Sequence, residues 1–209
     1  SSANVVDIKS SGWKNHGCAI EIDMEKSSQF ASSLLLSAWE LEYDLILLLK
    51  GNQSRSYLNM TIELLRHLGM DISDEGNQLF VPKNQKLLIR EVSVEPDMSS
   101  AFSVAAHAAL NGKAVFTNFP ISSLQPDFQF VKILGKMGAS VSWVSDQLIV
   151  EKESLQGLEL SLEQTPDLFP VLAALLSFAD GESHLTELDV LRYKESDRLG
   201  KTKQLLELS

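Results

Sequence analysis

Hydrophobic and polar residues follow one another along the chain in blocks that predict the same elements three times. Three long, mostly apolar stretches predict interior helices, at residues 29–39, 101–110 and 168–178. A short apolar run after each helix predicts a strand, at residues 45–49, 114–119 and 183–188. A second, amphipathic helix then follows, at residues 57–68, 128–137 and from 196 onward.

The repeat is supported by individual residues as well as by the elements. Gly69 and Gly138 each end an amphipathic helix, where glycine suits the left-handed residue that closes a helix. At matching offsets from them lie identical residues of the two closing strands: Gln78 and Gln147, Leu79 and Leu148, and Val81 and Val150. Two unrelated segments would not be expected to share so many positions at one offset, so we interpret the similarity as an internal repeat.

The repeating unit is therefore strand, helix, strand, helix, strand, strand, at about 65 to 70 residues. The pattern predicts an α/β (α+β) protein of repeated βαβαββ units: two whole copies at 18–82 and 92–151, and a third that begins near 158. Because the third copy stops inside its second helix, we expect the chain to be a piece of a longer protein. The polar stretch 82–90 predicts a boundary between one domain at 1–90 and another at 91–209.

Composition narrows the functional classes. A formal charge of −10 argues against nucleic acid as the main partner, because phosphate neutralisation needs a basic face. No apolar run has the roughly 18 residues of a membrane span. The single cysteine, Cys18, cannot form an internal disulfide or a zinc site alone, which favours a reducing cytoplasm. We interpret Cys18 and His107 as core residues, and no residue spacing predicts a metal site.

Two places carry candidate chemistry. Ser27-Ser28 and Asp167 each lie at a predicted helix start, where they could simply cap the helix. The functional interpretation of Ser27-Ser28 is an anion site. The functional interpretation of Asp167 is a group that accepts a hydrogen bond from a ligand or moves a proton. The segment 191–198 is dense in charge: Lys194 beside Glu195 suggests an acid/base pair, and Arg198 is placed to bind a carboxylate or phosphate. A solvated, self-paired run of charges is the alternative interpretation of that segment.

Several motifs occur in an order that resembles one family. They are Ser27-Ser28-Gln29-Phe30, Ser54-x-x-Tyr57 with Met60-Thr61, Asp97-x-Ser99-Ser100-Ala101, Gln125-x-Asp127, Lys136-Met137-Gly138-Ala139, Pro166-Asp167 and Lys194-Glu195-Ser196-Asp197-Arg198. Together they closely resemble the 5-enolpyruvylshikimate-3-phosphate (EPSP) synthases, or 3-phosphoshikimate 1-carboxyvinyltransferases. The Lys-Glu-Ser-Asp-Arg block and Ser-Ser-Gln are specific, whereas the other matches gain weight from their order.

The resemblance implies a two-lobed fold with three βαβαββ units in each lobe. It places the first copy last in the N-terminal lobe, and the other two in the C-terminal lobe, so the chain would span the hinge and hold roughly half of an enzyme. The implied reaction transfers the enolpyruvyl group of phosphoenolpyruvate to the 5-hydroxyl of shikimate 3-phosphate and releases phosphate. The resemblance implies no metal or organic cofactor, and a full-length protein that is monomeric.

The resemblance also implies a role for each motif residue. Ser27, Ser28 and Ser54 would hold the shikimate phosphate, Gln29 would contact both substrates, and Tyr57 would line the shikimate pocket. Asp167 would act as base near the reacting hydroxyl, and Lys194 would bridge the two substrates. Glu195 would handle the proton at C3, and Arg198 would clamp phosphoenolpyruvate.

The chain departs from the family at Arg55-Ser56, where Lys-Pro is frequent, and at Val190, where some members use Asn to contact shikimate. Segments that supply several of the family's cations are absent, so we expect the 209-residue chain alone to be inactive. One alternative is a non-catalytic anion-binding or interaction module of the same fold. Less favoured is a UDP-N-acetylglucosamine enolpyruvyl transferase, which needs a reactive cysteine in a loop.

Overall fold

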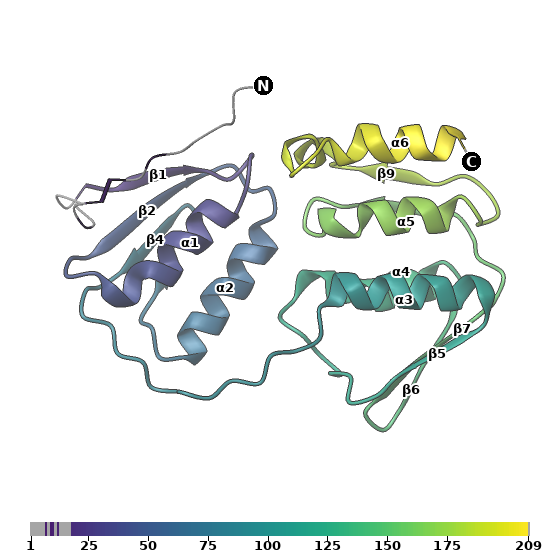
Figure 1. The fold of residues 1–209 in the computed structure, drawn as a ribbon, viewed down its shortest axis with the longest axis horizontal. Coiled ribbons are helices and arrows are strands. Elements are labelled where there is room, and N and C mark those ends of the chain that lie inside the picture. The colour runs from purple at the N-terminus through teal and green to yellow at the C-terminus, as the bar shows by residue number, and fades with distance from the viewer. Residues whose placement is uncertain (1–6, 8, 11, 13–17, 209) are drawn as a thin grey trace.

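The first repeat forms a small sheet covered by two helices. The structure is a computed structural model that describes residues 7, 9, 10, 12 and 18–208 (Figure 1). Strands β1 (Ile20–Asp23), β2 (Leu45–Lys50), β4 (Gln78–Val81) and β3 (Ser73–Asp74) pair in that order. β1 and β2 are parallel, and the other pairs are antiparallel. Helices α1 (Gln29–Ser37) and α2 (Arg55–His67) pack on the sheet, and a 3-10 turn, η1 (Ala38–Glu40), follows α1.

The second repeat keeps this arrangement but lacks its first strand. Helix α3 (Met98–Asn111) leads to β5 (Lys113–Phe116), the 3-10 helix η2 (Pro126–Gln129), α4 (Phe130–Lys136), β6 (Ser140–Val144) and β7 (Gln147–Glu151). The sheet order β5-β7-β6 repeats the order β2-β4-β3. The prediction of a strand at the start of this copy is wrong: residues 91–97 form no strand, and Val94 is 91% exposed. A strand requires a partner ladder, and no described strand pairs with this segment.

The third repeat forms only its first four elements. These are β8 (Glu159–Ser161), α5 (Phe169–Leu176) after the 3-10 turn η3 (Pro166–Leu168), β9 (His184–Thr186), and α6 (Arg198–Leu208) after the 3-10 helix η4 (Asp189–Tyr193). β8 and β9 are parallel, as β1 and β2 are in the first copy. The predicted order of elements in this copy is therefore confirmed.

Two separate hydrophobic cores hold the fold together. One lies within residues 22–81, between the first sheet and its helices. The other joins the second and third repeats and extends from Met98 to Leu191. Figure 1 shows α3, α5 and α6 as successive layers, and a stacked pair of rings, Phe102 and Phe130, joins α3 to α4 with centroids 5.6 Å apart. Residues 82–97, which link the two cores, form no helix or strand, and the domain boundary near residue 90 stays a prediction.

The glycines that close the amphipathic helices behave as predicted. Gly69 has φ +107° and Gly138 has φ +95°, both in the left-handed region that favours glycine. The next residue in each case bonds back to the helix, Met70 N to Leu65 O at 2.9 Å and Ala139 N to Leu134 O at 3.0 Å. These bonds satisfy carbonyl groups that the helix end would otherwise leave without a partner.

Three expectations about burial are wrong. The apolar helices are not interior on all sides: Phe30 and Leu36 of α1 and Val104 of α3 are more than half exposed. Each of these helices turns one apolar face away from its own core. Cys18 is exposed, because it lies before the paired residues of β1. His107 is also exposed on α3, where its ring nitrogen lies 3.3 Å from the Asn111 amide.

Asp97 stabilises the start of α3 and supports a prediction about folding. Its carboxylate accepts hydrogen bonds from the backbone N–H groups of Ser99, at 2.8 Å, and Ser100, at 3.2 Å. We expect Asp97→Ala to lower the free energy of unfolding by about 1 kcal/mol, because two amides at the helix start lose their acceptor. Urea unfolding measures this change. Ser100→Ala is the matched control, and an equal loss there would contradict the capping role.

Candidate active site

The first repeat contacts the third where the start of α2 meets the loop between β8 and η3. The backbone N–H of Ser54 donates to Glu163 O at 3.3 Å. Ser56 makes two bonds to Gln164: its N–H donates to Oε1 at 3.0 Å, and its hydroxyl donates to the backbone O at 2.5 Å. These contacts bring α2, with Ser54 and Tyr57, beside the segment that carries Asp167.

Ser54 has a backbone conformation that is unusual for a serine. It has φ 57° and ψ 26°, in the left-handed region, and its side chain is only 2% exposed. Its hydroxyl has no hydrogen-bond partner in the structure. A buried hydroxyl without a partner costs about 1–3 kcal/mol, so a bound group that paired with the Ser54 hydroxyl would remove this cost. A donor hydroxyl beside the start of a helix suits an anionic group.

Asp167 is the centre of a charged cluster. Lys194 Nζ lies 3.2 Å from Asp167 Oδ1, and Arg198 Nη1 donates to the same oxygen at 2.8 Å. These side chains are mostly shielded, with relative exposures of 30% for Asp167, 19% for Lys194 and 25% for Arg198. Asp167 is not the cap residue of either helix here: η3 has Thr165 at its N-cap and α5 has Leu168, and neither makes a side-chain capping bond. The interpretation of segment 191–198 as a merely solvated charge run is also wrong, because two of its cations bind a residue outside it.

Glu195 binds Arg198 from the other side. Arg198 Nε donates to Oε1 at 2.8 Å and Nη2 donates to Oε2 at 2.9 Å, so the guanidinium forks onto the carboxylate. This hydrogen bonding is the main reason that the pKa of Glu195 lies below its usual range, with backbone bonding and the charges of Arg198 and Lys194 adding to it. The same contact raises the pKa of Arg198, and Asp167 contributes further. Arg198 thus joins both candidate acid/base carboxylates.

The Glu195 contact gives a prediction about titration. In Arg198→Ala we expect the pKa of Glu195 to rise toward the ordinary range of a glutamate, because the forked donor is gone. The lowered pKa means that this contact stabilises the folded state above the ordinary pKa of glutamate and stops doing so as pH falls through the lowered value. Carboxyl-carbon NMR of labelled glutamate measures the shift. Arg192→Ala, which removes a partner of Asp197, is the control and should leave Glu195 unchanged.

The segment before α1 lies apart from this cluster in its bonding. The Ser27 hydroxyl accepts the N–H of Gln29 at 3.1 Å, from the position before the N-cap residue, which is Ser28. Ser28 is buried, at 6% exposed, and makes no capping bond, while Gln29 is exposed. Within the described residues, no hydrogen bond joins these three to Asp167, Lys194 or Arg198.

Tyr57 binds Asp127, a residue to which the sequence assigned no role. Its hydroxyl donates to Asp127 Oδ1 at 2.7 Å, and the other carboxylate oxygen accepts from the Ser99 hydroxyl. Asp127 is only 5% exposed, and burial is the main reason that its pKa is raised. The Gln125-x-Asp127 motif was visible in the sequence, but nothing there indicated that Tyr57 would be its partner.

The two departures from the family pattern have structural explanations. Arg55 stabilises the β3–β4 turn: its guanidinium lies 2.5 Å from Asp74 Oδ2 and donates to Gly76 O at 3.1 Å. It is therefore committed to its own repeat and does not serve as a cation at the junction. Val190 is 1% exposed and packs in the interior, so it lines no ligand site in this structure.

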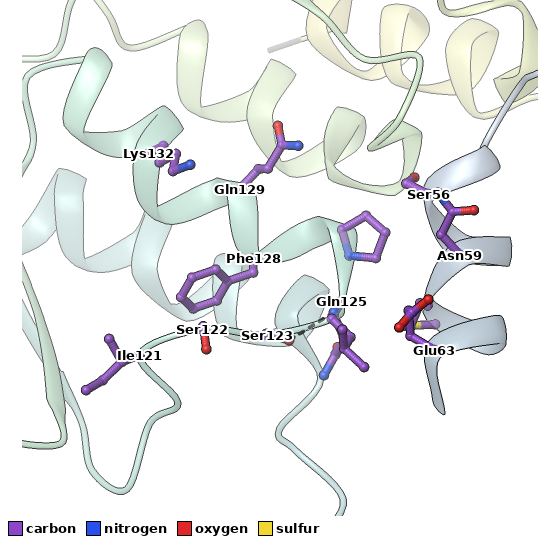
Figure 2. A pocket seen from close by; sticks show the side chains of 13 residues that line it. Ser56, Asn59, Glu63, Ile121, Ser122, Ser123, Gln125, Phe128, Gln129 and Lys132 are labelled. Carbon is purple, nitrogen blue, oxygen red and sulfur yellow. Dashed lines mark hydrogen bonds between the residues drawn. The ribbon is translucent and has the colours of Figure 1, made fainter. Parts of the chain in front are cut away.

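A cavity of about 550 Å³ also lies between the two parts of the chain. Figure 2 shows Ser56, Asn59 and Glu63 of α2 on one wall, with Phe128, Gln129 and Lys132 on the other. None of the nine residues predicted for the site lines it. This cavity is therefore distinct from the Asp167 cluster.

Within residues 7, 9, 10, 12 and 18–208, no helix has the length and apolar character needed to cross a membrane. In the same part of the chain, no three His, Cys, Asp or Glu side chains gather in a way that would hold a metal ion.

Comparison with known proteins decides the family. The family model for EPSP synthase (3-phosphoshikimate 1-carboxyvinyltransferase) matches residues 1–208. The chain belongs to the EPSP synthase family. The family assignment is the one that the order of motifs suggested, and the α/β fold class is likewise confirmed by solved structures.

Individual relatives agree with this assignment. The chain is 36% identical over 189 residues to the 3-phosphoshikimate 1-carboxyvinyltransferase of Methanococcoides burtonii, covering 88% of this chain and 44% of the relative. It is 34% identical over 182 residues to the one of Archaeoglobus fulgidus, covering 86% and 44%. The solved EPSP synthase of Acinetobacter baumannii is 25% identical with a TM-score of 0.66, covering 89% and 44%. The chain thus spans less than half the length of these family members.

Proposed function

We propose that this chain is part of an enzyme that transfers the enolpyruvyl group of phosphoenolpyruvate to the 5-hydroxyl of shikimate 3-phosphate. The hydroxyl oxygen adds to C2 of phosphoenolpyruvate while C3 gains a proton. The tetrahedral adduct then loses a proton from C3 and expels phosphate, which leaves the enolpyruvyl ether. No redox step is involved, and the atoms of both substrates are conserved in the two products.

The observation that carries this proposal is the convergence of Lys194 and Arg198 on Asp167. A carboxylate held by two cations is fixed in place, and the same cations can bind anionic substrates when these arrive. In the proposal, Asp167 accepts the proton of the reacting hydroxyl, Lys194 bridges the substrates and Arg198 holds phosphoenolpyruvate. A substrate anion on Arg198 would weaken its fork to Glu195 and raise the Glu195 pKa, which suits a group that delivers a proton to C3.

The other predicted residues form the shikimate side of the proposed site. Ser54 offers its buried, unpartnered hydroxyl to the substrate phosphate. In the proposal, Ser27, Ser28 and Gln29 at the start of α1 also contact the substrates. Tyr57 lines the pocket beside Asp167. In this proposal residues 1–90 end the N-terminal lobe and residues 91–209 begin the C-terminal lobe, so substrate binding closes the hinge between them. The full-length protein is proposed to be a cytoplasmic monomer that needs no cofactor.

Phosphate release from the two substrates tests the function. We expect the full-length protein to release phosphate only when phosphoenolpyruvate and shikimate 3-phosphate are both present. The isolated 209-residue chain should show no turnover, because it lacks cations that the family uses. A folded full-length protein that releases no phosphate would overturn the proposal and favour a non-catalytic anion-binding module. Turnover by the isolated chain would show instead that the missing segments are dispensable.

A further inference from the structure

A buried polar cluster at the lobe junction contains two residues, Asp127 and Ser99, that have no role in the reaction described above. It consists of Tyr57 from α2, Asp127 from η2 and Ser99 from the first turn of α3, and it is called the junction cluster here. Tyr57 belongs to the first repeat, whereas Asp127 and Ser99 belong to the second. Asp127 is thus the acceptor for two hydroxyl donors that come from opposite sides of the junction.

The position of the Tyr57 hydroxyl links this cluster to Asp167. Asp127 accepts the hydroxyl proton at 2.7 Å. Asp167 is near enough to act on the Tyr57 pKa: its backbone N–H lowers that pKa, and its negative charge raises it. Burial first, and then the negative charges of Asp127 and Asp167, raise the pKa of Tyr57 far above its usual range. The phenol therefore stays protonated and acts as a donor to Asp127 at all physiological pH values.

Burying the Asp127 carboxylate costs free energy. Its contact with Tyr57 therefore calls for a purpose in the fold or the site. Desolvation raises its pKa, and the nearby charges of Asp167 and Asp97 raise it further, while the bonds from Ser99 and Tyr57 oppose the rise. An asparagine or an apolar residue would avoid this cost. A carboxylate, however, accepts two hydroxyl hydrogen bonds at once, which are stronger than bonds between neutral groups.

We propose that Asp127 is a positioning residue that fixes Tyr57 against Asp167 and so sets the wall of the shikimate pocket across the lobe junction. The inference rests on the proposed function, since Tyr57 and Asp167 act there on shikimate 3-phosphate. Asp127 touches no substrate in this account. It acts through its hydrogen bond to the Tyr57 hydroxyl, which fixes the position of the Tyr57 ring relative to the Asp167 carboxylate.

Steady-state kinetics of the full-length protein test the inference. In Asp127→Ala we expect the KM for shikimate 3-phosphate to rise about tenfold or more, with a smaller change in the KM for phosphoenolpyruvate, because a displaced wall weakens one subsite. Asp127→Asn should recover much of the loss, since its amide oxygen still accepts from Tyr57. Tyr57→Phe combined with Asp127→Ala should be little worse than either single variant, because both remove one contact.

Asp97→Ala is the matched control. It removes a carboxylate from the same helix start and a negative charge near Asp127, but it has no bond to Tyr57. It should lower stability while leaving the KM for shikimate 3-phosphate as in the unchanged protein. Equal KM values in Asp127→Ala and Asp97→Ala, with turnover intact, would overturn the positioning role and leave the proposed function standing.

A spectroscopic measurement separates failure of the inference from failure of the function. The ultraviolet titration of Tyr57 is obtained as the difference between the unchanged protein and Tyr57→Phe. Removing Asp127 removes an acceptor and a negative charge, so Tyr57 should ionise at lower pH in Asp127→Ala than in Asp97→Ala. If the full-length protein proved inactive, this shift would still support the control of Tyr57 by Asp127, and its absence would refute it.

Discussion

Replacing Asp167 with asparagine in the full-length protein is expected to lower kcat by roughly 10³-fold, because a general base contributes 10² to 10⁴-fold to such reactions. The amide keeps the shape of the side chain but cannot accept the proton of the reacting hydroxyl. It also leaves Lys194 and Arg198 without the carboxylate that they share. Phosphate release at saturating concentrations of both substrates measures the change.

The control for this prediction is Asp180→Asn. Asp180 is an exposed carboxylate in the same part of the chain, in the segment between α5 and β9, and lies outside the charged cluster. Its kcat should stay within about twofold of the unchanged protein, as for most surface substitutions. If Asp167→Asn kept a kcat close to that of Asp180→Asn, Asp167 would have no role as base.

Lys194→Ala is the second large effect, with kcat/KM expected to fall by roughly 10³-fold, the size seen when a group that stabilises developing charge is lost. The Lys194 side chain is 19% exposed, and its Nζ lies 3.2 Å from Asp167 Oδ1. Removing it leaves the Asp167 carboxylate paired with Arg198 alone. Because the proposed role involves both substrates, both KM values should rise. Initial rates over a grid of the two substrate concentrations separate these effects.

Two further variants define the role of this lysine. Lys201→Ala removes an exposed lysine of α6, one turn beyond the cluster, and should leave kcat/KM unchanged. Lys194→Arg keeps the charge but replaces a compact ammonium by a planar fork, so it should recover only part of the activity. Full activity in Lys194→Ala would remove the lysine from the mechanism and leave Asp167 with Arg198 as its remaining cation.

Much of the fold was predictable because it depends on residues close to one another in sequence. The apolar period of α1, α3 and α5, and the glycines at 69 and 138, indicated where helices begin and end. A helix end is decided by hydrogen bonds within one turn, as the Met70 to Leu65 bond illustrates. The repeat strengthened each assignment, since two copies with matched Leu and Val positions predict the same pair of strands.

Burial was less predictable, since an apolar pattern indicates a face that favours contact without saying what covers it. Val92 and Val94 alternate like a strand, yet they remain exposed without a pairing partner. Phe30, Leu36 and His107 lie on helices that were correctly predicted, but on faces that their own core does not use. Whether a residue is interior depends on the whole packing around it.

Sequence by itself determined the family, the repeated unit and the identity of the charged residues, because each of these is recorded in short motifs and their order. Only the tertiary structure decided which of them meet. Arg198 and Asp167 are 31 residues apart, Tyr57 and Asp127 are 70 apart, and Ser56 and Gln164 are 108 apart. Such contacts form when separate elements pack, and packing depends on the shape and burial of many side chains together, which no local pattern contains.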